Sequence, residues 1–192
     1  MAVEYELKFQ ASEALQQAIA AKLPGPRQQI AMETTYYDTP TGRLSALRYT
    51  LRRRLENGVS VCTLKTPAGQ ARGEWEVGCE DIWTAIPLLI AAGAPAHLEE
   101  LTREGVIPIC GARFTRTAIT VTLTDGVVEV ALDIGFLLGG SRKLPLCEIE
   151  VELKEGTEAL CDRFAQELAA RYALTPEPES KFARALKLYR GD

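Results

Sequence analysis

Strict alternation of charged and apolar residues opens this chain. Residues 3–9 run Val-Glu-Tyr-Glu-Leu-Lys-Phe. Successive side chains of a β-strand point to opposite faces, so Glu4, Glu6 and Lys8 share one face and the apolar side chains share the other. The pattern therefore predicts a strand with an ionic face and a hydrophobic face.

A second stretch near the C-terminal end repeats this pattern. In residues 146–153, Glu148, Glu150 and Glu152 fall on one face, with apolar residues between them. A charged face in contact with water is an ordinary explanation for one such strand. Three glutamates on one face repel each other, however, so we expect a counter-charge or a metal ion beside them.

Length and charge exclude several classes of protein. The 192 residues fit one domain, residues 1–192, with a sizeable core. The 22 basic and 26 acidic residues give a net charge of −4, which argues against a general nucleic-acid or membrane-surface binder. No apolar run is long enough for a transmembrane helix, and we expect no signal peptide before the first strand. We expect a cytoplasmic protein, monomeric or homodimeric, that binds neither nucleic acid nor membrane.

The cysteines limit the available metal chemistry. There are five, an odd number, and no two are spaced as Cys-x-x-Cys, so neither a disulfide framework nor a zinc site is expected. Any metal must then be bound by carboxylates, which favour Mg²⁺ or Mn²⁺.

About eight stretches have the period of a β-strand. They are residues 3–9, 28–37, 49–55, 59–65, 71–77, 114–123, 127–134 and 146–153. Helical patterns cover residues 12–22, 80–93, 97–104, 158–172 and 181–189. The pairs Asn57-Gly58 and Asp125-Gly126 predict tight hairpins. Pattern alone leaves open whether the ionic face of the sheet points into a closed barrel or out to solvent.

Basic residues share the ionic faces with the acidic ones. Arg52 and Arg54 fall on one face of their strand and Arg53 on the other, while Arg113 falls on the face opposite to Arg116. Lys181 begins a predicted helix, where the macrodipole disfavours a cation, so an anionic partner is expected. Arginine and lysine bind phosphate oxygens and carboxylates hold Mg²⁺, so an enclosed ionic face would suit a polyanion with a divalent cation.

An ordered set of motifs runs through nearly the whole chain. The motifs are Glu4-x-Glu6-x-Lys8, Tyr36-Tyr37-Asp38-Thr39-Pro40, Leu51-Arg52-Arg53-Arg54, Thr63-Leu64-Lys65, Arg72-Gly73-Glu74, Phe114-Thr115-Arg116, Ala131-Leu132-Asp133, Cys147-Glu148-Ile149-Glu150-Val151-Glu152 and Ser180-Lys181. This set resembles the CYTH superfamily, the triphosphate tunnel metalloenzymes, and most of all its inorganic triphosphatase branch. The resemblance implies an α+β fold, a closed antiparallel eight-stranded β-barrel that forms a triphosphate tunnel, with helices packed outside.

The resemblance also implies a role for individual charged residues. The triphosphate would be bound by Lys8, Arg52, Arg54, Lys65, Arg116 and Lys181. The metal ligands would be Glu4, Glu6, Asp133, Glu148 and Glu150. The catalytic residues would be Glu4, Glu6, Lys8 and Glu150. Further candidates are Glu74, Glu152, Arg72 and Arg113.

The activity implied by this resemblance is metal-dependent hydrolysis of the terminal phosphoanhydride bond of a small-molecule triphosphate, with Mg²⁺ or Mn²⁺ as cofactor. Inorganic tripolyphosphate is the first choice of substrate. The alternatives are a thiamine or nucleoside triphosphatase, a class IV adenylate cyclase, and a non-catalytic polyphosphate-binding module. The module is disfavoured because binding an anion alone would not need five carboxylates.

Overall fold

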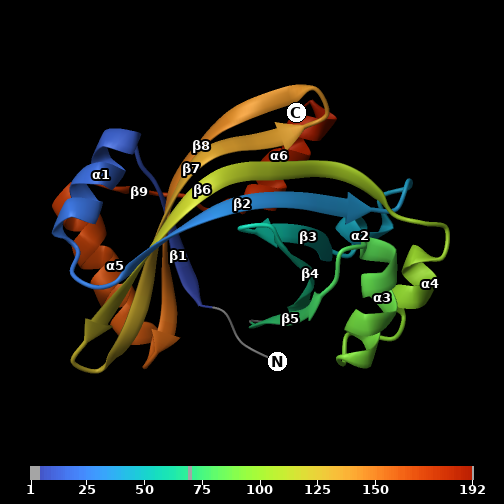
Figure 1. Cartoon of the computed structure of the whole chain (residues 1–192), viewed down its shortest axis with the longest axis horizontal. Coiled ribbons are helices and arrows are strands. Elements are labelled where there is room, and N and C mark those ends of the chain that lie inside the picture. Colours follow the sequence, from blue (N-terminus) through green and yellow to red (C-terminus); the bar gives the residue numbers. More distant parts are fainter. Residues whose placement is uncertain (1–4, 69–70, 192) are drawn as a thin grey trace.

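One nine-stranded antiparallel sheet dominates the computed structural model, which describes residues 5–68 and 71–191 (Figure 1). The strands are β1 (Glu6–Gln10), β2 (Arg27–Asp38), β3 (Thr50–Glu56), β4 (Val59–Ala68), β5 (Ala71–Gly78), β6 (Ile107–Leu123), β7 (Gly126–Gly139), β8 (Arg142–Glu155) and β9 (Thr175–Pro176). The helices are α1 (Glu13–Lys22), α2 (Arg43–Ala46), α3 (Ile82–Ala91), α4 (Leu98–Thr102), α5 (Glu158–Tyr172) and α6 (Lys181–Arg190). Every predicted strand and helix occurs, whereas α2 and β9 were not predicted.

The predicted closed barrel is wrong. The strand order is β5-β4-β3-β2-β6-β7-β8-β1-β9, so in the described residues the sheet ends at β5 on one side and at β9 on the other. Closure of eight strands would need β5 to pair with β1. The free edge of β1 instead pairs with β9, where Phe9 lies opposite Pro176 and Gln10 opposite Thr175. Alternation along a strand specifies its two faces but carries no information about which edges meet.

The hairpin signals act as predicted. Asn57 and Gly58 join β3 to β4 with positive φ angles of 51° and 86°, which matches the twist of a two-residue hairpin turn. Asn57 also accepts a hydrogen bond from the backbone N–H of Ala31 at 2.9 Å, so the turn is fixed to β2. This hairpin determines which residues of β3 and β4 share the ionic face.

Helices cover the apolar side at the two ends of the sheet. At one end α1 and α5 pack on β1, β7 and β8, where Ile19, Leu132 and Ile149 belong to one buried cluster. At the other end α3 and α4 cover β4 and the adjoining strands, with Leu64 and Leu89 in a second cluster. These two groups of helices lie far apart in Figure 1.

Helix α6 differs from the other helices because it lies on the ionic side of the sheet. Phe182 and Ala185 pack against Tyr36, Phe114 and neighbouring residues of β2, β6, β7 and β8, and the ring centres of Tyr36 and Phe182 are 4.9 Å apart. The prediction that helices pack outside the sheet is therefore wrong for α6. None of the helices in the described residues has the length and apolar character needed to cross a membrane.

Candidate active site: a cationic cavity beside a buried ion cluster

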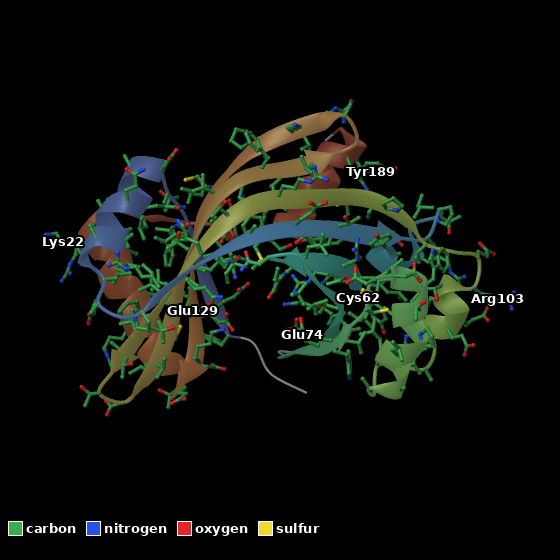
Figure 2. All side chains as sticks on the ribbon, viewed as in Figure 1. Lys22, Cys62, Glu74, Arg103, Glu129 and Tyr189 are labelled. Atoms are coloured by element: carbon green, nitrogen blue, oxygen red, sulfur yellow. The ribbon has the colours of Figure 1, made fainter. Side chains whose placement is uncertain are left out.

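A cavity of about 850 Å³ lies on the ionic side of the sheet. The six residues predicted to bind triphosphate all line it: Lys8, Arg52, Arg54, Lys65, Arg116 and Lys181. They come from β1, β3, β4, β6 and α6, so elements far apart in the sequence converge here. Figure 2 shows two acidic residues that line the same cavity, Glu74 on β5 and Glu129 on β7, while Lys22 and Arg103 lie at the two ends of the molecule.

Alternation along β3 separates its three arginines as predicted. Arg52 and Arg54 line the cavity. Arg53 points to the other face, where its guanidinium donates hydrogen bonds to the Ser60 hydroxyl at 3.0 Å and to Glu80 at 3.2 Å. The Nε of Arg54 is buried and has no hydrogen-bond partner in the described part of the chain, although Nη1 pairs with Glu56 at 3.1 Å. This donor of Arg54 is therefore left unsatisfied by the described residues.

Below one wall of the cavity lies a buried ion cluster built around Lys181. The ammonium lies 2.9 Å from Asp133, 2.5 Å from Glu148 and 2.6 Å from Glu150. Arg116 donates two hydrogen bonds of 2.8 Å to the carboxylate of Asp133 and also pairs with Glu150. Asp133 and Glu148 are 0% and 1% exposed, so these charges are stable only because they are paired.

The register of three strands assembles this cluster. Arg116 of β6 lies opposite Asp133 of β7, which in turn lies opposite Glu148 of β8. Two residues further along β8, Glu150 lies opposite Lys8 of β1. Partners in an antiparallel pair share a face, so the predicted metal ligands Asp133, Glu148 and Glu150 meet, with ligand atoms within 4.8 Å of one another.

Pairing determines the ionisation of the cluster. Burial alone would raise the pKa of Glu150, yet Lys181 and Arg116 hold that pKa well below its ordinary value. Burial alone would lower the pKa of Lys181, but the three carboxylates around it, Glu150 first, hold it above its ordinary value. Burial raises the pKa of Glu148, although Lys181 acts against this. Lys181 and Glu150 are therefore both charged at neutral pH.

Arg184 belongs to this cluster, but it was not predicted from the sequence as a site residue. It pairs with Glu148 and, at 3.4 Å, with Glu177, which accepts a hydrogen bond of 2.9 Å from Gln10 of β1. Arg184 follows Lys181 by three residues on α6, so both lie on one helix face. That spacing was the available signal, but the sequence did not show that this face meets the sheet.

Gln16 is a second residue that was missed. It lies on α1, is fully buried, and its side-chain amide donates to the backbone carbonyls of Asp133 at 3.2 Å and Glu148 at 2.9 Å. The amide thereby ties together the two strands that carry these carboxylates. A polar residue on the buried face of an amphipathic helix was the signal for such a contact.

The remaining predicted residues divide between the cavity and other places. Glu6, Glu74, Glu150 and Glu152 line the cavity, whereas Asp133 and Glu148 are buried and do not line it. Glu74 pairs with Lys65 at 3.2 Å and Arg52 at 3.8 Å, Glu6 with Lys8 at 3.8 Å, and Glu152 with Lys154 at 2.8 Å.

Of three further predicted residues, the structure describes the side chain of Arg113 alone. Arg113 lies on the opposite face of β6, as its spacing predicted, and pairs there with Glu33 at 2.9 Å. Glu4 and the side chain of Arg72 lie outside the described residues. The interpretation of Arg113 as a triphosphate ligand has no geometric support.

Comparison with protein families identifies the fold. The family model for the CYTH domain matches residues 2–186. The chain belongs to the CYTH family. Over 134 residues, this CYTH chain is 31% identical to an inorganic triphosphatase of Haemophilus influenzae; the match covers 67% of this chain and 38% of that relative. The match therefore spans less than half the length of this curated relative.

Solved structures with the same fold include three further proteins. A putative adenylyl cyclase from Hippeastrum, described as having a dominant triphosphatase activity, has a TM-score of 0.67 at 19% identity, covering 100% of this chain and 96% of its own. A Pyrococcus horikoshii protein has a TM-score of 0.65 at 21% identity, covering 96% of this chain and 99% of its own. A putative adenylate cyclase from Bacillus halodurans has a TM-score of 0.63 at 17% identity, covering 95% of this chain and 96% of its own. These similarities support the CYTH fold.

Proposed function

We propose that this CYTH chain hydrolyses the terminal phosphoanhydride bond of a triphosphate, with inorganic tripolyphosphate as substrate and Mg²⁺ or Mn²⁺ as cofactor. The convergence of six cations on one cavity carries this proposal. Cations from several strands can contact several phosphate groups at once, and arginine does so with two parallel hydrogen bonds. The spare buried donor of Arg54 supports it, because a buried donor without a partner costs about 1–3 kcal/mol that a phosphate oxygen would offset.

The acidic residues fit a divalent cation of this kind. Asp133, Glu148, Glu150 and Glu6 offer only carboxylate oxygens, the hard donors that Mg²⁺ and Mn²⁺ prefer. Lys181 already places a cation among three of them, which marks a position where positive charge is favoured. When bound, the metal would polarise a phosphoryl oxygen or lower the pKa of a water molecule.

The residues of the chain would supply binding and charge stabilisation. Phosphoryl transfer passes through a loose transition state in which charge spreads over the phosphoryl oxygens. Lys8, Arg52 and Arg54 would orient the phosphates and offset this charge, while Glu6 would help to hold the cation. Glu150 connects the carboxylates that would hold the metal with the cations that would bind phosphate, because it lines the cavity and pairs with both Arg116 and Lys181.

Tripolyphosphate is preferred to larger triphosphates for two reasons. The motifs of the chain resemble the inorganic triphosphatase branch, and the relative from Haemophilus influenzae carries that name. The cavity walls are also mainly ionic, which suits an anion that is charged along its whole length. Thiamine triphosphate and nucleoside triphosphates remain the competing substrates.

Phosphate release from tripolyphosphate, thiamine triphosphate and ATP, each with Mg²⁺ or Mn²⁺, tests this function. Release from tripolyphosphate in preference to the other two supports the proposal. Formation of cyclic AMP and pyrophosphate from ATP would indicate a cyclase instead. Tight binding of tripolyphosphate without turnover would indicate a binding module and would overturn the proposal.

Neighbouring arginines on β3 provide a matched control for the site. Arg54→Ala removes a cation from the cavity and should lower kcat/KM for tripolyphosphate by at least about tenfold, equivalent to about 1.4 kcal/mol. Arg53→Ala removes the same charge from the opposite face and should leave kcat/KM within about twofold. Equal losses in the two variants would show that the cavity is not where the triphosphate reacts.

A further inference from the structure

Lys181 has no donor left for a phosphate. An ammonium group has three N–H donors, and three carboxylates lie within 2.9 Å of the Nζ of Lys181. The same side chain nevertheless lines the cavity, whereas Asp133 and Glu148 do not. Lys181 therefore lies at the boundary between the ion cluster and the cavity. To contact a triphosphate it must first release at least one carboxylate.

The charges of the cluster explain why this release needs compensation. Four carboxylates face three cations: Asp133, Glu148, Glu150 and Glu177 against Arg116, Lys181 and Arg184. Removing a cation from buried carboxylates would leave uncompensated charge, which is strongly destabilising. Adding a divalent cation while all three side-chain cations stay would place five positive charges against four carboxylates. Exchange of Lys181 for the divalent cation would leave four positive charges (Arg116, Arg184 and the 2+ ion) against four carboxylates, so it avoids both costs.

Among the three cations, Lys181 is the one suited to exchange. Arg116 is held by paired hydrogen bonds to Asp133, and its planar guanidinium is fixed in direction. Lys181 is a compact charge on a flexible stem. Its ammonium contacts Asp133, Glu148 and Glu150, whose oxygens lie close enough together for one metal ion to bind all three. Its ammonium also lies 5.5 Å from the centre of the Phe114 ring, which lines the cavity.

We propose that Lys181 and the divalent cation compete for the same three carboxylates, so that binding of the cation releases the Lys181 ammonium to the triphosphate. This inference rests on the proposed function for the identity of the cation and the substrate. Coupling between binding sites is reciprocal, so the cation and the triphosphate each raise the affinity for the other. Lys181 thus serves as an internal counter-ion before the cation binds and as a phosphate ligand afterwards.

A Mn²⁺ titration without triphosphate tests the competition. Free Mn²⁺ is measured by electron paramagnetic resonance in the wild-type chain, in Lys181→Met and in Lys65→Met. Lys181→Met should bind Mn²⁺ at least tenfold more tightly than wild type, because the competing ammonium is gone. Lys65→Met removes the same charge from β4 in the same cavity and should change the affinity by no more than about threefold through long-range electrostatics.

Unchanged or weaker Mn²⁺ binding by folded Lys181→Met would overturn the inference. The substitution could also unfold the chain, so a second measurement uses wild-type protein with ¹³Cε-labelled lysine. Mg²⁺ should shift the Lys181 resonance, identified by its absence in Lys181→Arg, toward the position of exposed lysines. A Lys181 resonance that Mg²⁺ does not move would refute the exchange.

The failure of this inference can be told apart from the failure of the proposed function. Phosphate release by wild type together with unaltered Mn²⁺ affinity in Lys181→Met would defeat the exchange alone. Tighter Mn²⁺ binding by Lys181→Met in a chain that releases no phosphate would defeat the triphosphatase assignment alone.

Discussion

The contact between Arg184 and Glu148 gives the sharpest test of the buried ion cluster. Glu148 is 1% exposed, and Arg184 is one of two cations that pair with it in the described residues. Breaking a buried pair by removing one partner costs about 3–5 kcal/mol. Since Lys181 would still pair with Glu148, we expect Arg184→Met to lower the free energy of unfolding by about 2–3 kcal/mol.

A double-mutant cycle isolates the interaction. Arg184→Met, Glu148→Gln and the double variant are compared with wild type by urea unfolding. The double variant should be less destabilised than the sum of the two single variants, with a coupling energy of about 2 kcal/mol. For a chain of this length, 1 kcal/mol corresponds to about 2–4 °C, so Arg184→Met alone should lower Tm by about 4–12 °C.

An exposed ion pair on the same sheet is the control. Arg113 and Glu33 are 2.9 Å apart, but their side chains are 65% and 45% exposed. Solvent screening limits the coupling energy of such pairs to about 0.2–1 kcal/mol, so the double-mutant cycle of Arg113→Met and Glu33→Gln should give a value near the lower end of that range. A coupling energy for Arg184 and Glu148 no larger than that of this exposed pair would refute the interpretation of the cluster.

Three further outcomes follow from buried contacts. Gln16→Leu removes two hydrogen bonds to backbone carbonyls and should lower the free energy of unfolding by about 1–3 kcal/mol in urea unfolding. Burial raises the pKa of the Cys62 thiol to about 11, so above pH 9 the unfolded chain loses this proton before the folded chain does. The free energy of unfolding should therefore fall between pH 9 and pH 11, and it should fall less in Cys62→Ala. Phe114→Leu removes the ring beside Lys181 and should weaken tripolyphosphate binding in calorimetry by about twofold to tenfold, whereas Phe114→Tyr, which keeps a ring, should not.

Alternation along the strands was sufficient to assign the faces of the sheet. It separated Arg52 and Arg54 from Arg53, and it placed Arg113 on the far face, as the structure has them. Face assignment succeeds because the side-chain period of a strand is two, whatever the neighbouring strands are. The barrel prediction came from the family resemblance, and alternation could not test it. Closure depends on the pairing of edge strands, and here the two-residue strand β9, too short to leave a pattern, occupies an edge of β1.

Contacts between helices and the ionic face could not be predicted in the same way. The amphipathic pattern of α1 identified a buried face, but it did not show that Gln16 would reach the backbone of β7 and β8. Arg184 looked like an ordinary charged residue of a surface helix. Both contacts link residues more than 30 positions apart, and sequence periodicity describes only neighbours within one element.

Lys181 shows how a local conflict in the sequence can indicate a long-range partner. It occupies the first turn of α6 after the N-cap Ser180, where the helix dipole is unfavourable for a cation, so the sequence predicted an anionic partner without naming it. The structure supplies three carboxylates, and two of them lie so deep that only pairing makes their charges tolerable. The position of Lys181 is therefore determined by the charges of β7 and β8 rather than by helix stability. A cation held in place by charge alone can be replaced by another cation, which is why the affinity of Lys181→Met for Mn²⁺ distinguishes a structural lysine from an exchangeable one.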